Sequence, residues 1–367
     1  MSEFGIFMGC APGLEAWLAE EAVERGFDGV EAVGGGVICR GDWPEVWRAN
    51  LEMRGASRVL VRVAEFRAFH LAQLDKRARK VAWGEVLRPD VPVRVEATCR
   101  KSKIYHAGAA AQRVERAIAE ELGAPLAKDA EIVVKVRIED DLVSVSLDSS
   151  GEGLHKRGHK TAVGKAPMRE TMAALFLRAC GYRGGESVVD PMCGSGTFPI
   201  EAAEIAAGLQ AGRGRNFAFE RLAGFDAGAV QALRRDGPER VPGVPFFGFD
   251  RDQGAVRMAE ANAGRAGVAE WARFACQPVS ALEPPEGAVP GLVIANPPYG
   301  GRIGDRKLLF ALYGSFGEVL RQRFRGWRVG VITSDGGLAK AMGLPFEAGP
   351  PVAHGGLSVK LYRTRVL

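Results

Sequence analysis

The second half of the chain alternates short apolar runs with amphipathic segments. Four apolar runs predict buried strands, at Ser187–Val189, Phe246–Asp250, Leu292–Ala295 and Val329–Thr333. Three further stretches have helical spacing, at Met168–Cys180, Thr197–Ala207 and Gln253–Ala263. Strands that alternate with helices indicate an α/β fold with a doubly wound, mostly parallel sheet. A final strand, Leu357–Arg363, follows a Gly355-Gly356 turn and is predicted to be antiparallel to its neighbour.

The first half mixes strands and helices in shorter pieces. Strand patterns occur at Phe4–Cys10, Val37–Arg40, Val59–Val63, Val91–Ala97, Ile132–Ile138 and Leu142–Leu147. Helical patterns occur at residues 14–23, Pro44–Arg54, Leu71–Val81 and Ala110–Leu122. Glu139-Asp140-Asp141 predicts a hairpin turn between the last two strands. We therefore expect an α/β or α+β module that ends near Asp148, followed by a Gly-rich basic linker at residues 151–166.

Composition narrows the class of protein. The 367 residues, 47% hydrophobic and 25% charged, are enough for two or three domains. No apolar run approaches the roughly 18 residues that a membrane span needs, and the first residues lack a signal-peptide pattern. Six scattered cysteines form no CxxC pair, and the five histidines are dispersed. We therefore expect a cytoplasmic protein with reduced thiols, no disulfide frame and no metal site.

Charge is unevenly distributed along the chain. The net charge is only +5, but residues 48–116 hold 16 basic and 7 acidic side chains, and residues 153–169 hold 5 basic and no acidic ones. The flanking segments are acidic. Two basic blocks favour a polyanionic partner such as RNA. The alternative is that these cations only decorate solvated helix faces.

The run Val188–Thr197 predicts a ligand-binding turn between a buried strand and a helix. Asp190 ends the strand, and Gly194 and Gly196 let a ligand approach the backbone beside the N–H groups of the next helix. A dinucleotide fingerprint would need a third glycine near position 199, where Pro199 stands. A carboxylate before the turn would repel a pyrophosphate, but it suits a cationic amino-acid tail such as that of S-adenosylmethionine.

Asp250 ends the next strand, where a carboxylate can accept hydrogen bonds from ribose hydroxyls. Asp252 is the competing candidate, although it also suits the N-cap of the following helix. Cys193 lies inside the first turn, so we interpret it as a small packing residue rather than a nucleophile.

The run Leu292–Gly300 reads as a buried strand that ends in Asn296-Pro297-Pro298-Tyr299. A carboxamide oxygen and a proline carbonyl can accept the two hydrogens of an exocyclic base amine and draw its nitrogen toward tetrahedral geometry. The prolines preorganise the loop. Tyr299 offers a face on which a flipped base could stack. The simpler reading of this run is a proline-rich turn.

Two basic segments are candidates for RNA contact. The run 100–106 interleaves cations with aromatic and imidazole rings, which favours phosphate contact together with base stacking, through Arg100, Lys101, Lys103, Tyr105 and His106. In the linker, Lys156 and Arg157 are candidate RNA-backbone contacts. A solvated loop is the alternative for each segment.

Together these motifs resemble those of class I S-adenosylmethionine-dependent RNA methyltransferases with an N-terminal THUMP domain. The bacterial enzymes that methylate guanine N2 in 23S ribosomal RNA are the most similar group, and older annotation called such proteins adenine-N6-specific DNA methylases. The similarity extends to Pro12-Gly13-Leu14-Glu15, residues 48–60, Cys99–His106, Leu154–Gly158 and Ala166–Glu170.

The resemblance implies four segments and a set of site residues. The segments are a ferredoxin-like piece at 1–50, a THUMP RNA-binding domain at 51–150, the linker at 151–166, and a Rossmann-like methyltransferase domain at 167–367. The implied catalytic residues are Asn296, Pro297, Pro298 and Tyr299. The implied cofactor-binding residues are Asp190, Pro191, Cys193, Gly194, Gly196, Thr197, Asp250, Arg251, Gln277 and Asn296.

The chain departs from the family at one cofactor position. An acidic residue usually follows the third strand and contacts adenine, but Pro278 stands there in Ala275–Ser280. Adenine recognition would then fall to Gln277 or to backbone groups. The family resemblance implies methylation of guanine N2 in RNA, with 23S ribosomal RNA as the expected substrate, and we expect a monomer. Adenine-N6 methylation of RNA or DNA, methylation of a tRNA guanine or of a protein glutamine, and a non-catalytic RNA-binding factor remain alternatives.

Overall fold

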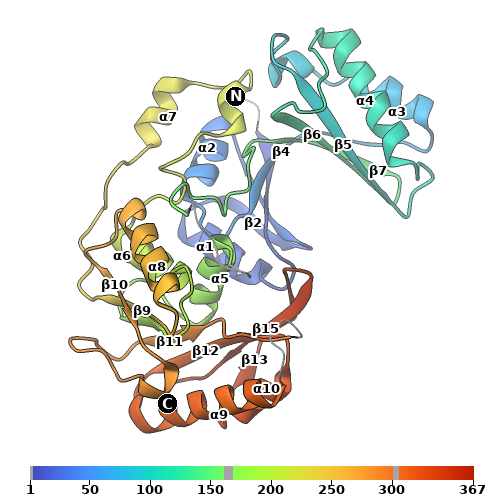
Figure 1. The fold of residues 1–367 in the computed structure, drawn as a ribbon. Coiled ribbons are helices and arrows are strands. Elements are labelled where there is room, and N and C mark those ends of the chain that lie inside the picture. The colour runs from blue at the N-terminus through green and yellow to red at the C-terminus, as the bar shows by residue number, and fades with distance from the viewer. Residues whose placement is uncertain (1–2, 161–167, 301–305) are drawn as a thin grey trace. The chain divides into compact units, whose positions relative to one another are not determined.

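The computed structural model describes residues 3–160, 168–300 and 306–367. The chain forms two compact units (Figure 1). Unit 1 comprises Met1–Gly9, Ala19–Leu154 and Arg215–Arg234, and unit 2 comprises Cys10–Leu18, His155–Gly214 and Arg235–Leu367. The predicted linker at 151–166 lies partly outside the described residues. The predicted boundaries at 50, 150 and 166 stay predictions.

The segment Arg215–Arg234 belongs to unit 1, although the sequence predicts that it continues the second domain. The guanidinium of Arg215 donates hydrogen bonds to the carbonyl oxygens of Ser150, Glu152 and Gly153, at 2.8–3.2 Å. The ring of Phe219 lies 6.5 Å from that of Trp47. No local sequence pattern could predict that this segment packs with unit 1, because its partners are more than 60 residues away in the sequence.

Unit 1 contains a seven-stranded sheet in the order β2-β3-β1-β4-β7-β6-β5, in which only β5 and β6 are parallel neighbours. The strands are β1 Phe4–Gly9, β2 Asp28–Val33, β3 Gly36–Gly41, β4 Arg58–Arg67, β5 Val93–Arg100, β6 Ile132–Glu139 and β7 Leu142–Asp148. The helices of unit 1 are α2 Trp43–Glu52, α3 Leu71–Ala78, α4 Ala107–Leu122 and α7 Ala227–Leu233, with short 3-10 turns η1 Trp83–Glu85 and η2 Ala218–Arg221. Helix α1 Glu15–Glu24 begins in unit 2 and ends in unit 1.

The β6–β7 hairpin confirms the predicted turn. Asp140 and Asp141 have φ angles of 48° and 62°, the pair of positive values that a two-residue hairpin turn requires. The long strand β4 pairs with β1 and with β7 across a register shift near residue 63. Strand β2 was not predicted from the sequence. It is an edge strand whose residues are mostly exposed, so it lacks an apolar pattern.

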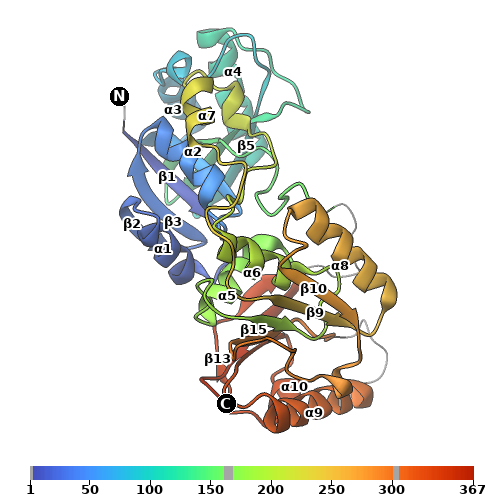
Figure 2. The same ribbon diagram turned by 90° about the vertical axis from the view of Figure 1, so that its left-hand side faces the viewer.

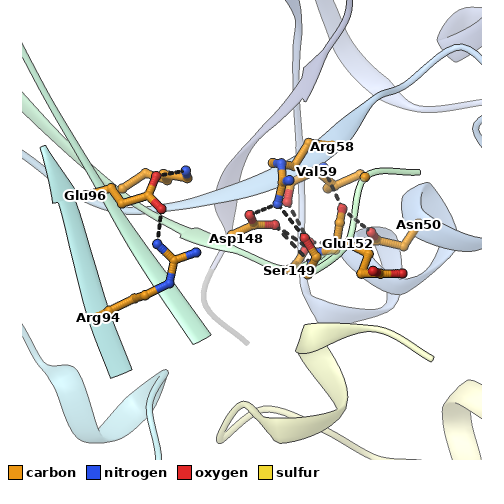
Figure 3. Close-up of polar contacts among 12 residues, drawn as sticks. Asn50, Arg58, Val59, Arg94, Glu96, Asp148, Ser149 and Glu152 are labelled. Carbon is orange, nitrogen blue, oxygen red and sulfur yellow. Dashed lines mark hydrogen bonds and ion pairs between the residues drawn. The ribbon is translucent and has the colours of Figure 1, made fainter. Parts of the chain in front are cut away.

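A buried polar network fixes the end of β7 to α2 and β4 (Figure 3). The buried Asp148 carboxylate pairs with Arg58 and accepts the backbone N–H of Ser150 at 3.1 Å. The Asn50 side chain donates to the Ser149 hydroxyl at 2.9 Å and accepts the Ser150 hydroxyl at 2.6 Å. Burial raises the pKa of Asp148 and Arg58 opposes that shift. The network holds together segments that lie about a hundred residues apart in the sequence.

Unit 2 contains the predicted doubly wound sheet, in the order β10-β9-β8-β11-β12-β15-β13, with β14 paired to β15. The first five strands of this order are parallel, and β15 is antiparallel to β12, which confirms the predicted orientation of the last strand. The strands are β8 Val188–Asp190, β9 Phe246–Asp250, β10 Ala272–Cys276, β11 Leu292–Ala295, β12 Arg328–Thr333, β13 Glu347–Ala348, β14 Val352–His354 and β15 Leu357–Arg363.

Helices cover both faces of this sheet (Figures 1 and 2). On one face lie α5 Glu170–Ala179, α6 Thr197–Ala207 and α8 Gln253–Ala266, and on the other lie α9 Arg306–Arg323 and α10 Gly336–Ala341 with the 3-10 turn η3 Val279–Ala281. Every residue of β8 and β11 is buried, as expected for central parallel strands. Among the described residues, no helix is both long and apolar enough to cross a bilayer.

The strand order reverses between β8 and β11. From β8 the chain continues to β9 and β10 on one side, and then returns to β11 and β12 on the other. In open α/β sheets, ligands bind at such a switch point, outside the carboxyl ends of the strands. Both sequence motifs follow these two neighbouring strands.

Candidate active site

The turn between β8 and α6 has the geometry of a ligand-binding loop. Gly194 and Gly196 have φ angles of +52° and +83°, which favour glycine. A Cβ at Gly196 would lie 2.9 Å from the Cβ of Ala259 and 3.0 Å from the Phe274 ring, whereas a Cβ at Gly194 would meet no described atom within 4 Å. The turn is therefore packed against α8 and β10 at Gly196 and open at Gly194.

Two carboxylates lie at this turn, Asp190 at the end of β8 and Asp250 at the end of the neighbouring β9. Asp190 is 2% exposed and accepts the N–H of Met192 at 3.1 Å. Asp250, at the end of β9, accepts the N–H of Gly194 at 3.0 Å and thereby ties the neighbouring loops together. Asp252 caps α8 by accepting the N–H of Gly254 at 2.7 Å. Asp250 also accepts the N–H of Asp252 at 3.0 Å, and its bond to Gly194 makes it the carboxylate of the two that contacts the turn.

Electrostatics make this turn suited to a cationic group. Burial is the main cause that raises the pKa of Asp190, and the charge of Asp250 raises it further, against the Met192 hydrogen bond. Burial and the same two carboxylates also raise the pKa of the Cys193 thiol. A protonated, buried thiol is a poor nucleophile, which agrees with a packing role for Cys193.

The Asn296–Tyr299 loop follows β11 at the same edge of the sheet. Val293 pairs with Val189, so Asp190 and Asn296 emerge from adjacent strands within a few residues of this pair. The Oδ1 atom of Asn296 is buried and accepts no hydrogen bond from any residue that the structure describes. Such an atom loses its hydration without compensation, so it marks a place where a ligand donor would be favourable. Tyr299 packs at the border of the core beneath α9.

The loop after β10 is held by local hydrogen bonds. The Gln277 N–H donates to the Asp250 carbonyl at 2.9 Å, and the Gln277 side-chain amide donates to the Ala281 carbonyl. Arg251 is exposed beside it. Pro278 precedes η3 and has no N–H to offer. Adenine contact by Gln277 therefore depends on its remaining carbonyl oxygen and stays a prediction.

The segment 155–160 is mostly anchored rather than solvated. Arg157 pairs with Glu201 of α6 at 3.4 Å, with side chains only 2% and 1% exposed. Lys160 donates to the Thr197 hydroxyl at 2.8 Å, at the first residue of α6 after the turn. This pairing corrects the prediction that Arg157 contacts RNA, because the buried carboxylate of Glu201 already binds its guanidinium group. Lys156 is exposed and stays a predicted contact.

The predicted RNA residues of unit 1 lie between β5 and α4. Tyr105 is 84% exposed. Lys103 lies over the ring of Phe69, with 5.0 Å from its Nζ atom to the ring centroid. Phe69 is itself 41% exposed and precedes α3, so it was absent from the sequence prediction, and only its exposure reveals it. Tyr105 follows Lys103 by two residues, and these three exposed side chains are the candidate RNA patch of unit 1.

The other three members of the predicted segment flank this patch in the sequence. Arg100 pairs with Glu139 at 3.6 Å, and its side chain stays 71% exposed. Lys101 is exposed at the turn after β5. His106 caps α4 by accepting the N–H of Ala109 at 3.0 Å, so part of its role is structural.

A family model described as the RMKL-like methyltransferase domain matches residues 157–349, which is more than half of the chain. The chain belongs to the RMKL-like methyltransferase family. A second model, the RlmL ferredoxin-like domain, matches residues 5–60 of this methyltransferase. Both findings confirm the fold and the family that the two motifs predict.

Among curated proteins, slr0064 of Synechocystis sp., named as a candidate RNA methyltransferase, is 32% identical over 97% of this chain and 95% of its own length. The ribosomal RNA large subunit methyltransferase K/L of Marinobacter nauticus is 34% identical over 94% of this chain. That of Methylococcus capsulatus is 33% identical over 97% of it. This RMKL-like methyltransferase spans about half the length of the two K/L proteins.

Several solved structures resemble the whole chain, and two of them show the range of descriptions. One is described as a predicted N6-adenine-specific DNA methylase from Listeria monocytogenes, with a TM-score of 0.90, 29% identity and coverage of 100% of this chain and 97% of that one. The other, SMU.472, is a candidate methyltransferase complexed with S-adenosylhomocysteine, with a TM-score of 0.89, 27% identity and coverage of 100% of both chains.

Proposed function

We propose that this RMKL-like methyltransferase transfers a methyl group from S-adenosylmethionine to an exocyclic amine of a base in RNA. The observation that carries the proposal is the buried Oδ1 atom of Asn296 beside the β8 turn, which has no hydrogen-bond partner among the residues that the structure describes. The turn fits the cofactor. A buried carboxylate at Asp190 suits its ammonium group, Asp250 suits its ribose, and the open backbone at Gly194 admits close approach.

The residues of the loop would act on the amine rather than on a leaving group. Bound S-adenosylmethionine supplies an electrophilic methyl carbon, and the departing thioether takes the electron pair of the broken C–S bond. Asn296 Oδ1 and the Pro297 carbonyl would accept the two amine hydrogens and orient the nitrogen lone pair for attack. A carboxamide is too weak a base to keep a proton, so the amine proton leaves to solvent after transfer.

The RNA substrate is proposed from the relatives and from the basic surface of unit 1. The two K/L relatives are named for large-subunit ribosomal RNA, which makes this RNA the proposed substrate. Guanine N2 is the proposed atom because of the family resemblance of the Asn296–Gly300 motif. The same pair of acceptors would also suit adenine N6, in keeping with the description of the Listeria relative.

Replacing Asp190 with asparagine is expected to raise the melting temperature of the ligand-free protein and to weaken binding of S-adenosylhomocysteine. The pKa of Asp190 is raised above its unfolded value of about 3.9, so the native state holds an extra proton between these two pKa values. Wild-type stability therefore falls as pH rises through this window, and the variant lacks that loss. Thermal melts across acid and neutral pH measure the effect. Asp252→Asn, which keeps a capping side chain, is the control. Equal dependence of the melting temperature on pH for wild type and Asp190→Asn would contradict the raised pKa of Asp190.

Replacing Tyr105 with alanine is expected to weaken RNA binding, because an exposed ring that stacks on a base contributes about 1–3 kcal/mol. Tyr105→Phe should bind as the wild type does, since it keeps the ring. Fluorescence anisotropy with a labelled RNA at fixed salt measures the affinity. Val23→Ala removes another exposed apolar side chain of unit 1 and serves as the control. Unchanged affinity for Tyr105→Ala would remove this patch from the RNA interface.

Methyl transfer can be tested with purified protein, tritiated S-adenosylmethionine and total RNA from a strain that lacks the protein. The expected result is radioactivity that becomes soluble on ribonuclease treatment and resists deoxyribonuclease and protease. Sizing the labelled RNA separates ribosomal from transfer RNA. Label that only deoxyribonuclease or protease releases would contradict an RNA substrate.

A further inference from the structure

Tyr313 connects helix α9 to the Asn296–Tyr299 loop. It is fully buried, and its hydroxyl donates to the carbonyl oxygen of Pro298 at 3.3 Å. The side chain of Thr333, the last residue of β12, is the polar neighbour that lowers the pKa of this hydroxyl. The Thr333 hydroxyl oxygen accepts the N–H of Asp335 at 3.2 Å, and Asp335 caps α10. A continuous polar chain therefore runs from the start of α10 to the loop.

The directions of these hydrogen bonds follow from the available protons. The Pro298 carbonyl can only accept, so the single hydroxyl proton of Tyr313 is donated to it. The Thr333 hydroxyl must then donate to Tyr313, while its oxygen accepts from the Asp335 backbone. A hydrogen bond that the phenol oxygen accepts from Thr333 lowers the pKa of Tyr313. Burial is the stronger influence and raises the pKa of Tyr313, so the donating form persists in alkaline solution.

The Pro298 carbonyl controls the next residue of the loop. Its peptide plane also contains the N–H of Tyr299, and the φ angle of Pro298 is fixed by its ring. The remaining freedom is the ψ angle of Pro298, which sets the direction in which Tyr299 leaves the loop. A hydrogen bond to this carbonyl therefore restrains the ψ angle of Pro298, the one soft backbone dihedral angle between the Pro297 carbonyl and the N–H of Tyr299.

We propose that Tyr313 is a positioning residue that locks the Pro298–Tyr299 peptide plane and so orients Tyr299 toward the target base. This rests on the proposed function of the loop. Tyr313 touches neither the amine nor the cofactor in this account. Thr333 supports it from β12, and the interior of unit 2 holds the pair in place because both side chains are fully buried.

Tyr313→Phe removes the hydroxyl and keeps the ring. The expected result is a fall in kcat of about tenfold, which corresponds to one hydrogen bond, with unchanged KM for S-adenosylmethionine and unchanged affinity for S-adenosylhomocysteine. Tyr182→Phe is the matched control, because Tyr182 is also buried in unit 2 and donates to a backbone carbonyl, that of Ala202, at 2.8 Å. The control should lose stability without losing kcat. A kcat for Tyr313→Phe equal to that of the control would overturn the proposal.

Variants at Thr333 test whether its hydroxyl group supports Tyr313. Thr333→Ser keeps the hydroxyl and should retain wild-type kcat. Thr333→Val has nearly the same shape but cannot donate, and it should lower kcat in the same direction as Tyr313→Phe. Equal kcat for the serine and valine variants would show that the hydroxyl does not support Tyr313.

A readout without RNA separates this proposal from the proposed function. The chain has five tyrosines, so 3-fluorotyrosine labelling gives a simple 19F NMR spectrum in which Tyr299→Phe identifies the Tyr299 resonance. Tyr313→Phe should shift or broaden that resonance and leave Tyr105 of unit 1 unchanged, whereas Tyr182→Phe should not affect it. An unchanged Tyr299 resonance would refute the lock even if the enzyme methylates RNA. A changed resonance would support it even if the substrate is not RNA.

Discussion

Replacing Asn296 with alanine is expected to lower the rate of methyl transfer by about a hundredfold to a thousandfold, while S-adenosylhomocysteine still binds. The loss is comparable to removing one preorganised polar group that interacts with the reacting centre. Asn296 Oδ1 is buried without a partner among the described residues, so the fold holds this acceptor ready for a substrate donor. Single-turnover rates with RNA and calorimetry with S-adenosylhomocysteine measure the two quantities separately.

Two further variants distinguish the acceptor from the volume of the side chain. Asn296→Leu has similar size and no acceptor, so it should be as inactive as the alanine variant. Asn296→Asp keeps an acceptor oxygen and should retain part of the activity. A leucine variant with wild-type turnover would show that the amide oxygen takes no part in the reaction.

Replacing Gly196 with alanine is expected to reduce methyl transfer by about a hundredfold, the loss typical of a displacement of about 1 Å in an active site. Its Cβ would lie 2.9 Å from the Cβ of Ala259 and 3.0 Å from the Phe274 ring, so the turn must move. The positive φ angle of +83° adds a conformational cost of about 1–2 kcal/mol. Single-turnover rates with RNA measure the loss of methyl transfer, and calorimetry with S-adenosylhomocysteine and thermal melts measure the accompanying losses of cofactor affinity and stability.

Gly267→Ala provides the matched control for Gly196. Gly267 caps the end of α8 with a φ angle of +72°, and its Cβ would meet no described atom within 4 Å. The control should therefore show only the conformational cost and keep its affinity for the cofactor product. If both variants bind S-adenosylhomocysteine as the wild type does, then the β8 turn does not form the cofactor site.

The sheet of unit 2 and its two motifs could be predicted because their physical signals are local. β8 and β11 are buried on both faces, so each is a continuous apolar run in the sequence. Asp190 and Asn296 follow those runs directly, and the rule that ligands bind at the carboxyl ends of parallel strands placed them at one edge. Their roles in binding and catalysis remain predictions that the variants above test.

Other features depended on contacts that no local pattern encodes. Arg157 looks like a surface cation in a basic segment, yet a buried glutamate 44 residues later pairs with it. Helix α9 contains Gly317, a poor helix former, where a Cβ would lie 2.0 Å from the Met342 carbonyl. The hydroxyl of Tyr313 reaches a proline carbonyl 15 residues away. In each case the partner is set by packing between elements rather than by periodicity.

The identity of the methylated nucleoside tests the central claim most directly. RNA labelled by the purified enzyme would be digested to nucleosides and the radioactive nucleoside identified by mass spectrometry, with Asn296→Leu as the blank. We predict N2-methylguanosine in the wild-type product and none in the blank. Label in N6-methyladenosine would keep the amine chemistry of the loop but contradict the proposed guanine. Label on a ribose or on a ring carbon would contradict methyl transfer to an exocyclic amine, because neither position offers an amine for Asn296 to hold.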